Sequence, residues 1–273
     1  MPDTMDAPFT LIPSAPDRQS PILFLCDHAS NLVPAPYGDL GLPASLFRTH
    51  IAYDIGAADV AAWLAQAYGA AAILGGVSRL LIDLNRGAGD PTLVMKLSDG
   101  SIIPGNRNAG DAEVADRLRR FHAPYHAAIR KEIARIESLP RARDSALVGE
   151  VAVADSRGCE GRRGPILISI HSFTPAWKTV ARPWEVGVLY GRDQRLAKPL
   201  MRQLATEGFT VGDNEPYTGA LEGDTLDTHG TKTGHPNVLI EIRQDFLTDA
   251  ALARTFAARL KPVLDRSLAE MER

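Results

Sequence analysis

Apolar runs that end abruptly in polar residues recur along the chain. The clearest covers residues 166–170, which follow a Gly-Pro pair and stop at His171 and Ser172. A short run rich in isoleucine and leucine is typical of a strand buried in a parallel or mixed sheet. The same pattern predicts strands at residues 21–26, 70–74, 80–84, 186–190, 209–211 and 238–243, with weaker candidates at 146–148 and 151–153.

Helical periodicity fills the intervals between these runs. Apolar positions recurring along one face predict helices at residues 54–68, 112–137, 196–207 and 248–271, and a short helical turn at 42–47. Pro124 is expected to bend the second of these helices or split it in two, because proline has no amide hydrogen to donate. Strands that alternate with helices indicate a layered α/β fold with a largely parallel sheet.

The sequence predicts one domain preceded by a short arm. Residues 1–20 are rich in proline, aspartate and serine and are expected to form a loosely tied N-terminal arm. Residues 21–273 then form a single domain, which is long enough for a sizeable core. Two long polar segments, 87–110 and 213–236, are expected to be loops. The first either covers a site or is an irregular surface excursion, and whether either loop closes over a substrate stays open.

Composition narrows the range of partners. The chain has a formal net charge of −3, so it needs no large basic surface and nucleic-acid binding is not indicated. No stretch approaches the roughly 20 apolar residues of a membrane span, and no basic segment followed by an apolar one marks a secretory signal. The two cysteines, Cys26 and Cys159, do not make a disulfide framework. A cytoplasmic protein with a buried, reduced Cys26 is expected.

Chemically useful side chains gather where the predicted strands end. His28 and His171 each follow a buried run, and Glu241 lies inside another. Open α/β sheets bind their ligands at the C-terminal ends of their strands. A catalytic zinc needs about three ligands from His, Asp or Glu and an open position for water. The two histidines predict such a centre, with Asp54 as the best oxygen ligand and Asn31 as a second possibility.

Glu241 is the candidate proton shuttle. Zinc-bound water loses a proton near neutral pH, and a carboxylate beside it can carry that proton to a leaving amine. A carboxylate inside an apolar run also needs a partner, because burying it unpaired is costly. Arg243, on the same face of the predicted strand, is the alternative partner in a purely structural pair.

Each of these residues also has a simpler interpretation. A single histidine at a strand end is more often a hydrogen-bonded structural residue than a ligand, and Asp54 could cap the helix that begins there. His122 and His126 are four apart, as in zinc-binding helices, but the glutamate of that motif is absent and Pro124 intervenes. A zinc pair is therefore disfavoured there, although His126 could contact a substrate. The chain contains no Gly-x-Ser-x-Gly elbow and no nucleotide-binding glycine motif.

Asn85 and Arg86 are candidates for substrate binding. An arginine side chain can hold a carboxylate with two hydrogen bonds, and an adjacent asparagine adds a donor. Such a pair at a strand end suits the carboxylate of an amino-acid-type substrate. Arg79 and Arg243 are weaker candidates for the same role. The alternative is a salt bridge between Arg86 and a carboxylate of the following loop.

These motifs together resemble the N-formylglutamate amidohydrolase family. They occur in the order of that family and span most of residues 21–247, and the stretch from Ser78 to Arg86 is the most specific. The matching segments are Asp27-His28-Ala29-Ser30-Asn31, Tyr53-Asp54-Ile55-Gly56, Ser78-Arg79-Leu80-Leu81-Ile82-Asp83-Leu84-Asn85-Arg86, Pro124-Tyr125-His126, Ile170-His171-Ser172 and Ile240-Glu241-Ile242-Arg243.

The resemblance implies a fold and a chemistry. The family is similar in fold to zinc carboxypeptidases and aspartoacylase-like deacylases, which implies a three-layer α/β sandwich with a mixed sheet of about eight strands. It also implies a zinc-bound water that attacks an amide, with Glu241 as general base and with Asn85 and Arg86 as contacts to a substrate carboxylate. The wider superfamily has a glutamate ligand three residues after the first histidine. This chain has Asn31 there, so the third ligand stays open between Asn31 and Asp54.

We therefore expect an amidohydrolase with one zinc per chain that cleaves the amide of an N-acylated acidic amino acid such as N-formylglutamate. One alternative is a metallopeptidase or peptidoglycan amidase on the same scaffold. Another is a binding protein that kept the fold and lost the metal. The sequence leaves the acyl group and the oligomeric state open.

Overall fold

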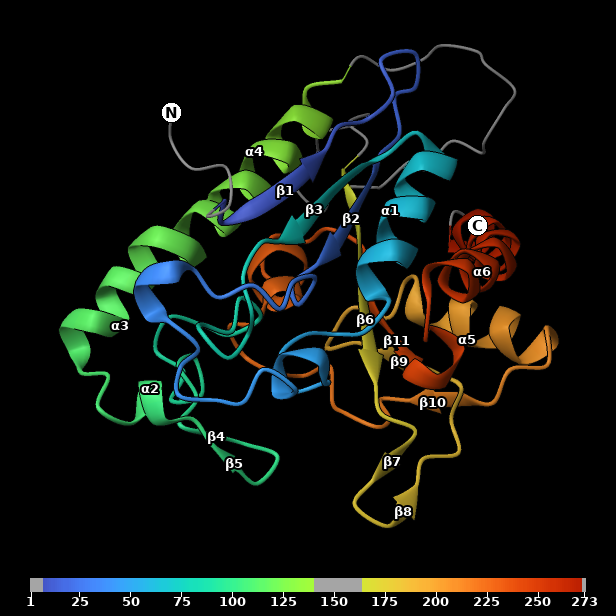
Figure 1. Ribbon diagram of the computed structural model, residues 1–273. Helices are drawn as coiled ribbons and strands as arrows, with labels where there is room; N and C mark the ends of the chain where they lie inside the picture. Colours follow the sequence, from blue (N-terminus) through green and yellow to red (C-terminus); the bar gives the residue numbers. More distant parts are fainter. Residues whose placement is uncertain (1–6, 140–163, 272–273) are drawn as a thin grey trace.

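A mixed sheet of seven strands forms the centre of the computed structural model, which describes residues 7–139 and 164–271 (Figure 1). Its strands, in spatial order, are β1 Phe9–Ile12, β3 Ala71–Gly75, β2 Ile22–Cys26, β6 Ile166–Phe173, β11 Asn237–Arg243, β9 Val186–Leu189 and β10 Val211–Asp213. The pairs β3–β2, β2–β6, β6–β11 and β9–β10 are parallel, whereas β1–β3 and β11–β9 are antiparallel. The predicted α/β fold with a mixed, mostly parallel sheet is confirmed.

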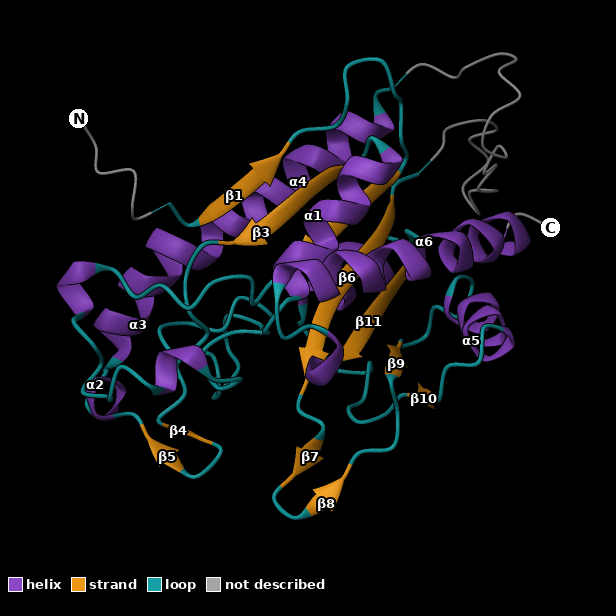
Figure 2. Ribbon diagram, turned by 45° about the vertical axis from the view of Figure 1, so that its right-hand side comes forward, coloured by secondary structure: helices purple, strands orange, loops and turns teal. Residues whose placement is uncertain are grey.

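Helices cover both faces of this sheet, because its central strands are apolar on both sides. In β2, Phe24 packs into one core, while Leu23 and Leu25 pack into the other. The first core is completed by α1 Ala57–Tyr68, α5 Ala197–Thr206 and α6 Ala250–Met271, and the second by α4 Ala123–Glu137. Figure 2 shows α1 and α6 in front of the sheet and α4 behind it.

The long predicted helix around Pro124 contains an irregular turn just before the proline. It consists of α3 Asp111–Arg117, one π-helical turn at Leu118–His122, and α4, whose first turn contains Pro124. Short elements complete the chain: α2 Pro104–Arg107, 3₁₀ turns at Ala35–Tyr37, Leu46–Arg48 and Gln244–Phe246, a π-helical turn at Asp227–Thr231, and two hairpins. The hairpins are β4 Leu97–Ser98 with β5 Ser101–Ile102, and β7 Ala176–Trp177 with β8 Val180–Ala181.

The strand predicted at residues 80–84 is wrong, because this buried apolar segment folds into turns. Its backbone carbonyls are satisfied by distant side chains instead of a neighbouring strand. Asn106 donates its side-chain amide to the carbonyl of Leu80 over 2.7 Å, and the buried Arg117 donates to that of Leu81 over 2.8 Å. An apolar run shows that a segment is buried, but it does not show where its backbone hydrogen bonds go.

Other differences lie at the edges of the prediction. Residues 9–12 of the predicted arm form β1, which pairs along β3 at the edge of the sheet. The strand candidates at 146–148 and 151–153 lie outside the described residues, as does Cys159, whereas Cys26 is buried with a free thiol. The helices of the described chain are all too short or too polar to cross a bilayer.

Candidate metal centre

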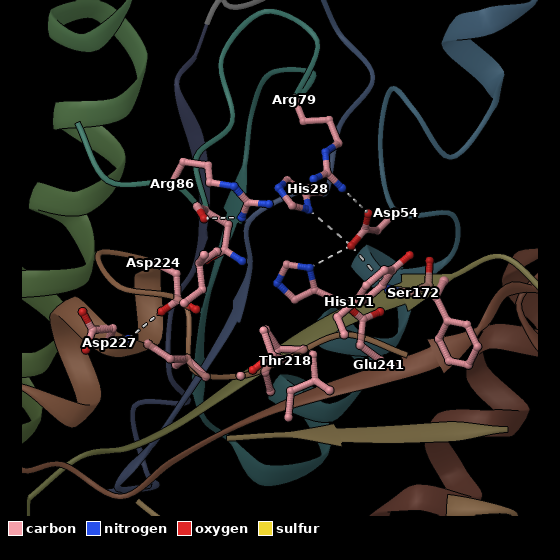
Figure 3. A pocket seen from close by; sticks show the side chains of 18 of the residues that line it. His28, Asp54, Arg79, Arg86, His171, Ser172, Thr218, Asp224, Asp227 and Glu241 are labelled. Carbon is pink, nitrogen blue, oxygen red and sulfur yellow. Dashed lines mark hydrogen bonds and ion pairs between the residues drawn. The ribbon is translucent and has the colours of Figure 1, made fainter. Parts of the chain in front are cut away.

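Three side chains from distant parts of the chain meet at the C-terminal end of the central strands. His28 follows β2, Asp54 precedes α1, and His171 lies near the end of β6. One ligand atom of each lies within 4.8 Å of the others, and all three residues are buried. In Figure 3 the two imidazole rings and the Asp54 carboxylate point toward one another. Among the described residues, this is the one His, Cys, Asp and Glu group with the spacing of a metal site.

Each histidine is oriented by a second buried aspartate. His28 Nε2 donates to Asp83 Oδ1 over 2.7 Å, and His171 Nε2 donates to Asp27 Oδ2 over 3.0 Å. The Nδ1 atoms of both rings therefore face Asp54 Oδ2, at 3.4 Å from His28 and 2.8 Å from His171. Metal-binding histidines commonly donate their other ring nitrogen to a carboxylate, which fixes the ring and its tautomer.

The electrostatics of the group favour a cation. Burial by itself raises the pKa of Asp27, Asp54 and Asp83, but the nearby histidines outweigh it and lower the pKa of all three carboxyls. Arg79 also pairs with this group, donating to Asp83 over 2.9 Å and lying 3.6 Å from Asp54 Oδ1. Three buried carboxylates thus face one guanidinium, which leaves an excess of negative charge around the two imidazoles.

Glu241 lies beside this group and has an unused oxygen. It is the register partner of His171 on the adjacent strand β11. Glu241 is 6% exposed, and its Oε2 is buried without a hydrogen-bond partner in the described chain. Burial raises the pKa of Glu241 to about 7, and the negative charge of Asp54 acts in the same direction. An unpaired buried carboxylate oxygen is costly. This oxygen therefore indicates that a group bound in the site donates a hydrogen bond to it.

The residues present fit a divalent metal. Two imidazole nitrogens and a carboxylate oxygen are the donor set of a catalytic zinc site with an open position. Both imidazoles already have the carboxylate partners that such ligands require. The unpaired oxygen of Glu241 is placed beside the group, where a bound water would need an acceptor.

A cavity of about 450 Å³ opens over this group and includes Glu241. Both long polar segments contribute to its walls: Ser98 and Asp99 come from residues 87–110, and Tyr217 and Asp224 from residues 213–236. The volume lies within the usual range for small-molecule sites, about 300–1,000 Å³.

Asn85 and Arg86 line the cavity, and Figure 3 shows Arg86 on one side of the metal-ligand group. The half-buried Arg86 donates to Thr92 Oγ1 and to the carbonyl of Asn85, and it forms no ion pair with a carboxylate of the described chain. The alternative salt bridge to the following loop is therefore not seen among these residues. Asp224 lies on the same side, and burial raises the pKa of its carboxyl to about 6.

Asn31 and Arg243, two other predicted site residues, make contacts away from the ligand group. Asn31 donates its side-chain amide to the carbonyl of Phe47 over 2.6 Å and does not line the cavity of the described chain, whereas Asp54 does, so the geometry favours Asp54. Asp54 is also not a helix cap, because Gly56 is the N-cap residue of α1. Arg243 pairs with Asp245 and donates to the backbone carbonyls of residues 182–184.

Arg79 and His126 contribute differently to the site. Arg79 lines the cavity, although its guanidinium is already paired with Asp54 and Asp83. His126 lies behind the cavity wall, where it donates to the carbonyl of Leu84 over 3.1 Å, and it is not among the lining residues of the described chain.

Sequence reasoning assigned no role to Asp27 and Asp83. Asp27 binds His171 and also accepts hydrogen bonds from Tyr125 Oη, Thr225 Oγ1 and Ser169 Oγ. Both aspartates lie within the family motifs, directly before His28 and two residues before Asn85. A buried aspartate next to strand-end histidines is the signal that could have identified them.

Comparisons with known proteins identify the family of this chain and solved structures that resemble it. The model of the N-formylglutamate amidohydrolase family matches residues 20–143 and 152–248. A solved gene product of Agrobacterium tumefaciens is 28% identical, with a TM-score of 0.82 over 97% of this chain and 96% of that one. The N-formylglutamate amidohydrolase from Ralstonia eutropha JMP134 is 21% identical, with a TM-score of 0.63 over 97% of both chains, and shares the fold. A search of the curated proteins finds no match.

Proposed function

The chain belongs to the N-formylglutamate amidohydrolase family, and from this premise we propose that it is a zinc-dependent hydrolase of N-acylated acidic amino acids such as N-formylglutamate. His28, Asp54 and His171 hold the metal, and Glu241 is the general base. The observation that carries the proposal is the unpaired Glu241 oxygen beside three converging ligand atoms.

A bound zinc would act as a Lewis acid that polarises the amide carbonyl and lowers the pKa of water to near neutral pH. The side chains of this protein do the rest. Glu241 accepts a proton from the attacking water at its Oε2, which has no hydrogen-bond partner among the described residues. It then passes that proton to the nitrogen of the leaving amine, so that the products are a carboxylic acid and a free amino acid.

The substrate is oriented by the side of the cavity that contains Asn85 and Arg86. Arg86 has no carboxylate partner among the described residues, so its guanidinium is available for a substrate carboxylate. Arg79 has a different role in this proposal, because its charge is taken up by Asp54 and Asp83. It keeps the buried carboxylates ionised and in place.

Glu241→Gln tests the catalytic role. The substitution keeps the size of the side chain but removes the base, so kcat on N-formylglutamate with zinc supplied should fall by about 10²–10⁴-fold. Zinc content and substrate affinity should stay close to those of the wild type. Glu185→Gln is the matched control, because Glu185 bonds the backbone of Thr210 outside the cavity.

Three results would contradict the proposal. Full activity of Glu241→Gln would show that Glu241 is not the general base. A wild-type protein that binds no divalent metal and gains no activity from one would indicate a binding protein. Turnover of peptides without turnover of small N-acyl amino acids would instead indicate a metallopeptidase or peptidoglycan amidase.

A further inference from the structure

Three aromatic side chains, which together form an aromatic wall, border the same cavity. Phe173, Trp177 and Tyr217 all line the cavity. Phe173 is the last residue of β6, Trp177 belongs to the β7–β8 hairpin, and Tyr217 comes from residues 213–236. Trp177 and Tyr217 are 43% and 44% exposed, so their rings are open to a ligand.

Arg182 holds the three rings together. Its guanidinium carbon lies 5.8 Å from the centre of the Phe173 ring, 5.6 Å from that of Trp177 and 5.1 Å from that of Tyr217. Arg182 also donates to Thr174 Oγ1 over 2.9 Å and to Tyr217 Oη over 3.2 Å. Among the described residues, the rings line the cavity but Arg182 does not. Trp177 and Tyr217 therefore offer ring surface to a ligand, whereas Phe173 is 1% exposed.

The position of the wall indicates that it faces the acyl end of the substrate. In Figure 3, Arg86 and Asp224 lie on one side of His28 and His171, and Ser172 lies on the other. Phe173 and the β7–β8 hairpin continue the chain from Ser172. An amide placed over the metal ligands with its amino-acid part at Arg86 therefore directs its acyl part toward the wall.

We propose that the acyl group of the substrate is an apolar group larger than formyl, bound against Trp177 and Tyr217. This inference rests on the proposed function and specifies its substrate class. A formyl group has no carbon beyond its carbonyl and would leave these rings without a contact. Burying apolar surface against aromatic rings is favourable, and ring pairs gain more than their buried area alone gives.

The test compares three substrates that differ only in the acyl group: N-formyl-, N-benzoyl- and N-succinylglutamate, with zinc supplied. The wild-type protein should have a kcat/KM for the benzoyl compound about tenfold or more above that for the formyl compound. Trp177→Ala should lower this benzoyl-to-formyl ratio by about tenfold. Val180→Ala is the matched control, because Val180 lies in the same hairpin, is 68% exposed and does not line the cavity.

Several outcomes overturn the inference and leave the proposed function standing. These are a preference for the formyl compound, an unchanged ratio in Trp177→Ala, and a preference for the succinyl compound. The last would mean that Arg182, and not the rings, makes the contact.

If none of the three compounds is hydrolysed, the proposed function fails. The proposed contact between the acyl group and the aromatic wall is then tested by measuring ligand binding. Calorimetry of N-benzoylglutamate with the zinc-loaded wild-type protein should then show binding that Trp177→Ala weakens. Absence of binding, or equal binding by both proteins, overturns it.

Discussion

Two groups of histidines lie near the C-terminal end of the sheet, and their partners differ. His28 and His171 contact buried carboxylates, whereas His122, His126 and His229 contact backbone carbonyls and one another. His126 Nε2 donates to the carbonyl of Leu84 and His122 Nε2 to that of Arg86. Since its Nε2 carries the proton, His126 accepts at Nδ1 from His229 Nε2, which lies 2.8 Å away.

The partners set the charge of each group. Burial acts to lower the pKa of every one of these imidazoles. The carboxylates overcome this effect and raise the pKa of His28 and His171. Without such partners, burial lowers the pKa of His126 to about 3 and that of His229 to about 4. The first group can therefore exchange protons for a cation, while the second is neutral and supports the backbone on both sides of Asn85.

The largest effect should come from removing one ligand of the first group. His171→Ala leaves two of the three ligands, so zinc content should fall from about one per chain to near zero and activity should be lost. His122→Ala removes a histidine of the second group and should keep the zinc. Metal analysis of both purified variants makes the comparison, and equal zinc loss would show that the two groups do not differ.

A smaller effect should follow from weakening a partner of the first group. Asp83→Asn removes the carboxylate that receives His28 Nε2, and such changes typically lower metal affinity by about 10–100-fold. Asp224 lines the same cavity but has no hydrogen bond to either ligand histidine. Asp224→Asn should therefore change the zinc affinity far less. Zinc competition titrations measure both, and an unchanged affinity in Asp83→Asn would argue against the orienting role.

The smallest effect concerns the stability of the second group toward acid. The unfolded chain protonates these histidines below pH about 6.5, but in the folded chain His126 and His229 protonate only near pH 3 and 4. Acidification between these values therefore favours unfolding. Urea unfolding of metal-free protein should show a smaller loss of stability from pH 7 to pH 4.5 in His126→Gln than in the wild type. Equal losses would mean that His126 takes up its proton equally in the folded and unfolded states, so that folding does not lower its pKa.

Much of the fold could be read from local patterns. The strands β2, β3, β6, β9 and β11 and the helices α1, α5 and α6 all correspond to predicted segments. The segment at 80–84 could not, because its apolar side chains suit a buried strand and a buried turn equally well. Contacts from Asn106 and Arg117, both distant in sequence, decide between the two.

The candidate site divides in the same way. His28, His171 and Glu241 are visible in the sequence, since polar residues at the ends of apolar strands stand out. The choice of Asp54 over Asn31, and the orienting roles of Asp27 and Asp83, are not visible there. They depend on where side chains point after the chain has folded.

The sequence by itself determined the family, the layered α/β architecture and the types of residue available for chemistry. Only the tertiary structure decided which of those residues meet. It brings His28 and His171 together, although they are 143 positions apart, and leaves the close pair His122 and His126 away from the ligand group. The physical reason is that a metal site requires donor atoms within a few ångströms of one another with buried partners behind them, and spacing along the chain sets neither condition.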